Sequence, residues 1–176
     1  VKPPLTESAP AADDSALAEL AHALEKAARK RLGRSLAIRQ VDAGSCNGCE
    51  LEIHALGNPY YNIEGMGIRF VASPRHADML LVTGPVSKHM AIALKRTYDA
   101  TPEPKLVVAV GDCGCTGGIF GESYATLGRV SNVIPVDAEV PGCPPTPTAL
   151  LQGILAAITA RVAVAGDGEP ATPPPT

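Results

Sequence analysis

The stretch KLVVAVGDCGCTGG (residues 105–118) joins a run of apolar, largely β-branched residues to a glycine-rich turn that carries two cysteines. A nearly unbroken apolar run of this length is typical of a strand that is buried on both faces of a sheet. Similar runs occur elsewhere and are also predicted strands: LAIRQVD (36–42), IRFVA (68–72), MLLVTG (79–84) and VIPVD (133–137).

Helical segments alternate with these strands. Apolar spacing predicts helices over 50–56, 88–100 and, after a group of prolines, 148–162. Strands that alternate with helices indicate an α/β fold, a parallel sheet with helices on both faces. Ligands of such sheets bind beyond the carboxyl ends of the strands. The loops expected together at that edge are 43–49, 84–87, 111–118 and 138–146.

The segment 14–34 is predicted to be an N-terminal helix that Asp14 or Ser15 caps and Gly33 ends. Its apolar stripe consists of Leu17, Leu20, Leu24 and Ala28. Its opposite face carries Lys26, Arg29, Lys30 and Arg31, either as a solvated face or as a docking surface for a partner.

Residues 1–13 and 164–176 are predicted to be disordered tails, because they are rich in Pro, Ala, Thr and acids. The α/β domain is then 35–163.

A net charge of −3, 3% aromatic residues and no Trp argue against a nucleic-acid partner. The chain start lacks the pattern of a signal peptide, and no apolar run approaches the roughly 20 residues of a membrane span. We expect a cytosolic location, where five cysteines are ligands or free thiols rather than disulfides.

All five cysteines lie in three of the predicted edge loops: GSCNGCE (44–50), GDCGCTGG (111–118) and VPGCPP (140–145). Thiolates that converge from three loops form a cage for an iron–sulfur cluster or for zinc. Glycines flank the cysteines and let backbone N–H groups approach anionic sulfur. A thioredoxin-like dithiol would leave the remaining thiols unexplained, and inert buried cysteines would not cluster at loop ends.

At these loops the sequence resembles the small, cluster-carrying subunit of membrane-bound nickel–iron hydrogenases of the formate hydrogenlyase type. It is similar also to the related 20 kDa subunit of respiratory complex I. The resemblance covers roughly residues 36–160 and rests on four stretches: DAGSCNGCELEI (42–53), RFVASPRHADMLLVTGPV (69–86), VAVGDCGCTGGIF (108–120) and VIPVDAEVPGCPPTPTAL (133–150).

The resemblance implies a flavodoxin-like fold and one [4Fe–4S] cluster, with Cys46, Cys49, Cys113 and Cys143 as iron ligands. The family's acid after the second cysteine falls on Glu52, a possible proton relay. The chain would be a non-catalytic electron-transfer subunit of an oxidoreductase. Its implied partners are a nickel–iron large subunit, a ferredoxin-like iron–sulfur subunit and membrane subunits, on the cytoplasmic side of the membrane.

The first cysteine motif separates the branches of this family, and Cys115 departs from the family pattern. The first motif is C-N-G-C, as in hydrogenase-type relatives, whereas complex I subunits have two adjacent cysteines there. Cys115 stands where relatives usually have another residue, so its loop offers two candidate thiols. A complex I-type subunit that works toward quinone is the alternative. A zinc-stabilised assembly module is the alternative from another class.

Other polar residues have structural interpretations beside functional ones. Glu50 is interpreted as an acid at a helix N-terminus, where its charge interacts favourably with the helix dipole. Glu52 fits this role and that of a proton relay equally well. His76 and His89 are expected in turns or on the surface. Arg75 and Asp78 form either a turn-stabilising pair or an interface contact.

Overall fold

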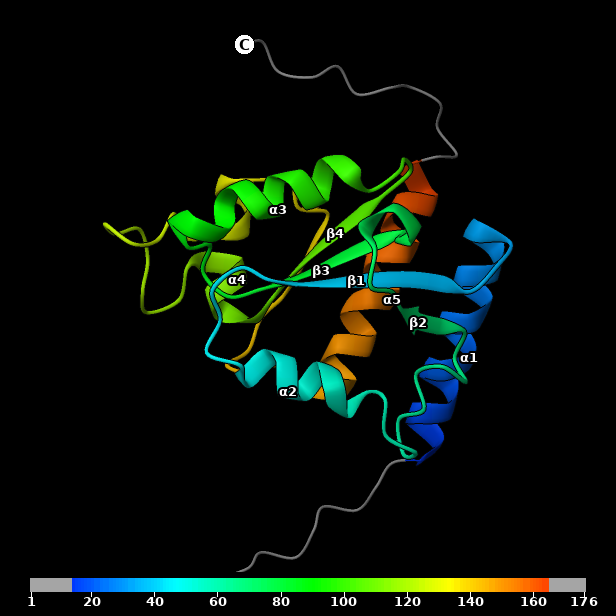
Figure 1. Ribbon diagram of the computed structural model, residues 1–176. Helices are drawn as coiled ribbons and strands as arrows, with labels where there is room; N and C mark the ends of the chain where they lie inside the picture. Colours follow the sequence, from blue (N-terminus) through cyan, green and yellow to red (C-terminus); the bar gives the residue numbers. More distant parts are fainter. Residues whose placement is uncertain (1–13, 165–176) are drawn as a thin grey trace, which may run out of the picture.

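The computed structural model describes residues 14–164, which form a five-stranded, wholly parallel sheet (Figure 1). The strand order is β2-β1-β3-β4-β5, the order of flavodoxin, so the predicted flavodoxin-like α/β fold is confirmed. The strands are β1 (Leu36–Asp42), β2 (Ile68–Phe70), β3 (Met79–Thr83), β4 (Leu106–Val110) and β5 (Ala138–Val140).

Helices cover both faces of the sheet, and each face has its own core. The helices α1 (Asp14–Leu32), α2 (Gly48–Ala55) and α5 (Pro147–Val164) pack on one face, and α3 (Lys88–Ala100) and α4 (Gly111–Thr116) on the other (Figure 1). Alternate residues of β3 separate the cores: Met79 and Leu81 face the α5 side, and Leu80 and Val82 face the α3 side. This alternation explains why the strand is apolar throughout.

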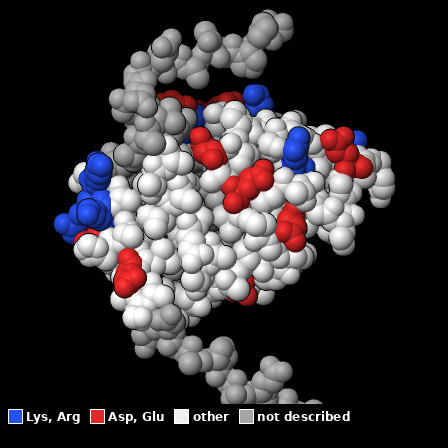
Figure 2. Space-filling view, turned by 180° about the vertical axis from the view of Figure 1, so that it is seen from behind, with Lys and Arg blue, Asp and Glu red and all other residues white. Residues whose placement is uncertain are grey.

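The first helix packs as its apolar stripe predicts. Leu24 and Ala28 are fully buried, and Leu17 and Leu20 pack against the same core. The predicted tails lie outside the described residues, except Val164, which ends α5. Lys26, Arg29 and Lys30 are exposed on α1, and Figure 2 shows Lys and Arg side chains gathered at one edge of the molecule. Among residues 14–164, no helix has both the length and the apolar character to cross a membrane.

The predicted strand at 133–137 is wrong, because the fifth strand begins only at Ala138. Pro135 has no N–H group to donate to a ladder. Asp137, just before β5, pairs with Val107 of β4: its N–H donates to Val107 O at 2.8 Å, and its Oδ2 accepts from Val107 N at 2.8 Å. The apolar residues of this segment pack into the α3-side core without joining the sheet.

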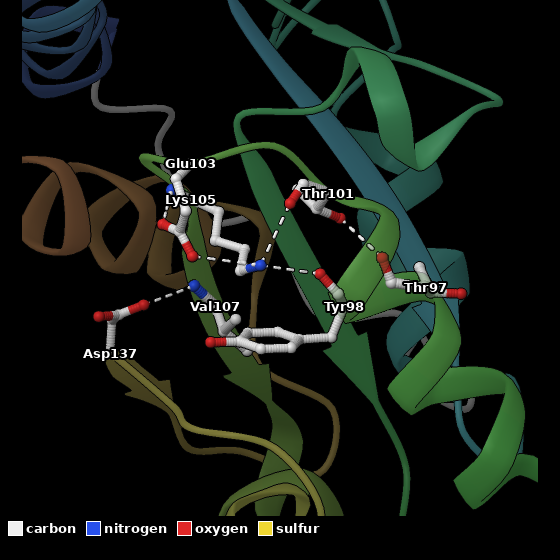
Figure 3. A network of polar contacts seen from close by, with 7 residues as sticks. All are labelled: Thr97, Tyr98, Thr101, Glu103, Lys105, Val107 and Asp137. Carbon is white, nitrogen blue, oxygen red and sulfur yellow. Dashed lines mark hydrogen bonds and ion pairs between the residues drawn. The ribbon is translucent and has the colours of Figure 1, made fainter. Parts of the chain in front are cut away.

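The connection from α3 to β4 is held by a buried lysine (Figure 3). Lys105 Nζ donates to Tyr98 O at 3.0 Å and to Thr101 O at 3.1 Å, and it lies 4.0 Å above the ring of Tyr98. Glu103 Oε1 pairs with the same ammonium at 3.2 Å. A cation at the last carbonyls of a helix satisfies groups that have no partner within the helix and favours the helix dipole.

Candidate functional site

The first cysteine loop leaves β1 through a turn that a side chain shapes. Asp42 Oδ1 accepts hydrogen bonds from the N–H groups of Gly44 and Ser45, both at 2.8 Å. Asn47 then adopts a left-handed conformation, with φ of 74°, directly before α2. Cys46 is consequently exposed in the turn, and Cys49 is half-buried in the first turn of α2.

The second loop is partly helical, which the prediction of an irregular loop at 111–118 missed. Residues 111–116 form the short helix α4, in which Cys113 and Cys115 are two positions apart. Since each helical residue turns the chain by about 100°, the two side chains leave opposite sides of the helix. Cys115 is 4% exposed in the α3-side core, with its Sγ 3.6 Å from Ala109 O, whereas Cys113 is only half-buried.

The third loop follows β5 and carries the exposed Cys143. It is joined to the second loop through Asp112 and Gly142. The Asp112 N–H donates to Gly142 O at 2.9 Å, and Asp112 Oδ1 accepts from Gly142 N at 2.7 Å. The two loops therefore lie side by side at the carboxyl edge of the sheet.

The pKa values of Cys49 and Cys113 are raised, mainly by burial. Burial raises the pKa of Cys49 to about 12, with further contributions from the charges of Glu50, Cys46, Cys113 and Cys143. Burial also raises the pKa of Cys113, and among the charges Cys143 contributes most. The pKa of Cys115 rises to about 11 through burial and the charge of Glu139, without a contribution from another thiol.

Two glycines allow the backbone to approach these sulfurs. Gly111 has φ of 79°, and a Cβ atom there would lie 2.6 Å from Cys49 Sγ. A Cβ atom on Gly118, which has φ of 54°, would lie 2.8 Å from Cys113 Sγ. Both distances are shorter than real Cβ contacts, and both φ values are ones that side chains rarely adopt, so a substitution at either position would strain the backbone and displace the sulfur. The Cys49 and Cys113 thiols thus pack directly against backbone.

All five cysteines are free thiols. Within residues 14–164, no group of three or more His, Cys, Asp or Glu side chains is arranged to hold a single metal ion. A [4Fe–4S] cluster uses a different arrangement, because each of its four cysteines binds a separate iron. The three loops adjoin one another, since a Cβ atom on Gly111 would lie 2.6 Å from Cys49 Sγ and 3.4 Å from Gly142 O. Thiols that come from three adjoining loops fit such a ligand set.

The acids beside the first motif differ in burial. Glu50 is 5% exposed, and neither of its carboxylate oxygens has a hydrogen-bond partner among the described residues. Glu52, the predicted relay, is half-buried. Sequence reasoning took Glu50 for an ordinary acid of a helix N-terminus. It does lie in the first turn of α2, but nothing in the sequence signals its burial.

The remaining singled-out residues have structural surroundings. His76 and His89 are exposed, as expected. Asp78 bonds to residues other than the suggested Arg75. It accepts hydrogen bonds from Arg34 Nη2 at 2.7 Å and from Ala37 N at 3.0 Å. These contacts anchor the start of β3 to the start of β1. They lie at the edge of the sheet opposite to the cysteine loops.

An apolar arm (residues 119–127) projects beyond the sheet edge next to the cysteine loops (Figure 1). Ile119 and Tyr124 are each 93% exposed, and Phe120 is 55% exposed. The base of the arm is rigid: Leu127 N donates to Val86 O at 2.7 Å, and Lys88 N donates to Ala125 O at 2.9 Å. Large apolar side chains held in solvent mark an interaction surface.

Known proteins resemble this chain over most of its length. It is 48% identical over 129 residues to the probable membrane-bound hydrogenase subunit mbhJ of Pyrococcus furiosus, covering 73% of this chain and 77% of that protein. It is 43% identical over 143 residues to formate hydrogenlyase subunit 7 of Escherichia coli K12, covering 80% of this chain and 56% of that protein.

A solved structure has the same fold. A chain of the membrane-bound sulfane sulfur reductase, an archaeal respiratory membrane complex, superposes with a TM-score of 0.64 at 35% identity, covering 78% of this chain and 74% of that one. The family model "NADH ubiquinone oxidoreductase, 20 Kd subunit" matches residues 46–157, a range that includes all five cysteines. The chain therefore belongs to the family of the 20 kDa subunit of NADH ubiquinone oxidoreductase, whose members are subunits of oxidoreductase complexes.

Proposed function

We propose that the chain carries one [4Fe–4S] cluster on Cys46, Cys49, Cys113 and Cys143 and transfers electrons within a membrane-associated nickel–iron hydrogenase. In this role it is a non-catalytic subunit. The catalytic residues belong to a large subunit that it contacts, and electrons continue to a ferredoxin-like iron–sulfur subunit.

One observation carries the cluster assignment. The three loops meet beside Cys49: a Cβ atom on Gly111 would lie 2.6 Å from Cys49 Sγ and 3.4 Å from Gly142 O, while Cys115 is turned into the core. Gly111 and Gly118, which lack side chains, let the backbone lie directly beside the sulfurs of Cys49 and Cys113. Backbone N–H groups near thiolate ligands stabilise their negative charge and help set the potential of a cluster.

The bound cluster supplies one-electron transfer, and the contribution of the chain is to hold and orient it. The four thiols must lose their protons to bind iron, so loading releases protons and becomes more favourable as the pH rises. Asp42 shapes the loop of Cys46, and α4 aims Cys113 at the same edge. Cys49, being half-buried, lies on the protein side of the site, and Cys46 and Cys143 lie on its open side.

The open side also supports the partner assignment. The apolar arm and Leu51, which is 60% exposed on α2, border the exposed cysteines. A subunit that covered this edge would exclude water from the cluster and shorten the path for the electron. Both named relatives belong to membrane-bound hydrogenase or formate hydrogenlyase assemblies. We propose the same setting here, with peripheral attachment on the cytoplasmic side through the other subunits.

A complex I-type subunit that passes electrons toward quinone is the second candidate, favoured by the name of the matching family. The C-N-G-C spacing of Cys46 and Cys49 favours the hydrogenase branch. Isolating the complex with this chain tagged separates the two candidates: the copurifying large subunit contains nickel in a hydrogenase and none in a complex I-type assembly.

Anaerobic purification of the full chain, expressed without the partner subunits that carry metal centres of their own, tests the cluster itself. We expect about four iron and four acid-labile sulfide per chain, as one [4Fe–4S] cluster requires, and an EPR signal of that cluster after reduction. Stoichiometric zinc without sulfide would overturn the proposal in favour of a zinc-stabilised assembly module.

A further inference from the structure

Asp112 lies between two of the proposed ligand loops and bonds across them. It precedes Cys113, and it pairs with Gly142, which precedes Cys143. The pairing is reciprocal, since the Asp112 N–H donates to Gly142 O at 2.9 Å and the carboxylate Oδ1 accepts from Gly142 N at 2.7 Å. Each member of the pair is thus one peptide unit from a cysteine, and a change in this contact would move Cys113 relative to Cys143.

The side chain supplies one of the two bonds that join the chain beyond the ends of two strands. β4 stops at Val110 and β5 at Val140, and beyond them the Asp112 N–H still donates to the backbone oxygen of Gly142. The return bond comes from a side chain, because Gly142 N donates to the Asp112 carboxylate. Gly142 has φ of 135°, and a Cβ atom there would come within 2.6 Å of the Pro145 Cα, so the loop backbone is closely packed at this residue.

Cys113 and Cys143 each follow directly on one member of this pair, so the contact acts at the base of both cysteines. Asp112 itself is half-buried and belongs to the turn that starts α4. It is therefore placed to act on the spacing of the two sulfurs without being a ligand.

We propose that Asp112 is a positioning residue that locks the Cys113 and Cys143 loops at the separation that the iron–sulfur cluster requires. This inference rests on the proposed function. It assigns to Asp112 the role that groups bonded to metal ligands commonly have, which is to fix the ligands in the bound geometry before the metal arrives.

The chain contains a matched control at the other end of the same two strands. Asp137 N–H donates to Val107 O at 2.8 Å, and its Oδ2 accepts from Val107 N at 2.8 Å. This contact between β4 and the segment before β5 has the same two-bond pattern and also joins residues thirty positions apart. Figure 3 shows this contact beside Lys105, at the start of β4, whereas the cysteine loops follow the ends of the strands.

The first experiment measures the rate at which a ferrous chelator removes iron from the loaded, anaerobic protein. We expect Asp112→Ala to release iron about tenfold faster than wild type or more, the lower end of the loss typical for groups that orient ligands. Asp112→Asn keeps an acceptor oxygen at the same place and should restore slow release. Asp112→Glu keeps the charge but displaces the acceptor, and it should release iron quickly.

Asp137→Ala separates positioning from general stability. We expect it to lower the Tm about as much as Asp112→Ala while its iron release stays at the wild-type rate. Equal acceleration by both alanine variants, or a wild-type rate for Asp112→Ala, would overturn the inference while leaving the cluster assignment intact.

A second measurement uses the cluster-free protein. A short bifunctional maleimide is added to the reduced chain, and the fraction of Cys113–Cys143 bridges is determined by mass spectrometry. We expect fewer bridges in Asp112→Ala than in wild type, Asp112→Asn and Asp137→Ala. Equal fractions would contradict the lock. If wild type held no cluster, the proposed function would fail, and this measurement alone would still decide the role of Asp112.

Discussion

At the scale of single residues, Cys113 and Cys115 have opposite surroundings although only one residue separates them. The helical turn of α4 sends Cys115 into the α3-side core beside Ala109, and it leaves Cys113 half-buried at the edge near Cys143. A helix separates positions i and i+2 by about 200°, whereas an extended chain would place them on the same side. The choice between two candidate ligands thus depends on six residues of helix.

The first prediction concerns this pair. Cys113→Ala should lose or damage the cluster, because one iron would lack its thiolate. Cys115→Ala should retain the full content of iron and sulfide, because it removes only a small buried group. Both variants are assayed for iron and labile sulfide after anaerobic purification, with the EPR signal as the check on cluster type. Retention in Cys113→Ala together with loss in Cys115→Ala would reverse the ligand assignment.

The second prediction concerns thiol reactivity in the cluster-free protein. The thiolate is the reactive form, and burial holds the pKa of Cys115 at about 11 and that of Cys49 at about 12. At pH 8 we expect iodoacetamide to modify the exposed Cys46 and Cys143 first, and Cys49 and Cys115 last, as followed by peptide mass spectrometry. The labelling of Cys115 should increase as the pH rises toward 11. In denaturant all five cysteines should react alike, and early labelling of Cys115 in the folded chain would refute its burial.

At the scale of elements, the start of β4 is anchored by Lys105, whose ammonium closes the end of α3. Lys105 is 8% exposed, and its hydrogen bond to Thr101 O is buried while that to Tyr98 O is partly buried. β4 then leads directly into α4 and Cys113. The clamp therefore fixes the strand that carries one of the proposed ligands, from the end opposite to the site.

The third prediction follows from this clamp. Lys105→Met keeps the aliphatic stem but leaves the Tyr98 and Thr101 carbonyls without their donor, which should cost about 1–3 kcal/mol of unfolding free energy. The control is Lys95→Met at an exposed position of α3, which should change the free energy of unfolding by less than about 0.5 kcal/mol. Urea denaturation monitored by circular dichroism measures both. A similar, small effect of the two substitutions would show that the clamp contributes little.

At the scale of the whole molecule, the apolar arm and the cysteine loops share one edge, while the exposed cations of α1 lie elsewhere. A monomer rarely keeps side chains such as Ile119 and Tyr124 almost wholly in water. The hydrogen bonds at the base of the arm hold it in place, so a partner would meet a surface that is already ordered. This arrangement suits a subunit whose apolar arm is covered by a partner.

The fourth prediction is that the isolated chain self-associates and has no hydrogenase activity. Combining Ile119→Ser and Tyr124→Ser should shift the mass measured by light scattering toward the 18.1 kDa monomer, because the exposed apolar surface is reduced. Ile92→Ser, at a 63% exposed position on α3, is the control and should leave self-association unchanged. A monodisperse wild-type monomer that evolves hydrogen alone would contradict the prediction.

The sequence by itself determined the layers of the fold and the edge that carries the site. Continuous apolar runs at β3 and β4 require burial on both faces, and their alternation with helices requires parallel pairing. Because parallel strands end at one edge, the order of strand and cysteine along the chain was enough to bring three loops together. The α3 helix at 88–100 was predicted without error, because apolar spacing along a helix is a local pattern.

Only the tertiary structure decided matters that depend on contacts between distant residues. The fifth strand begins at Ala138 because Asp137 pairs with Val107, thirty positions away, and no local pattern announces that contact. The burial of Glu50 and of Cys115 likewise depends on the elements packed around them. The Asp112–Gly142 contact has the same origin. Side-chain bonds between loops arise once the sheet has placed those loops side by side, so spacing along the chain predicts the meeting of the loops but not the atoms that hold them.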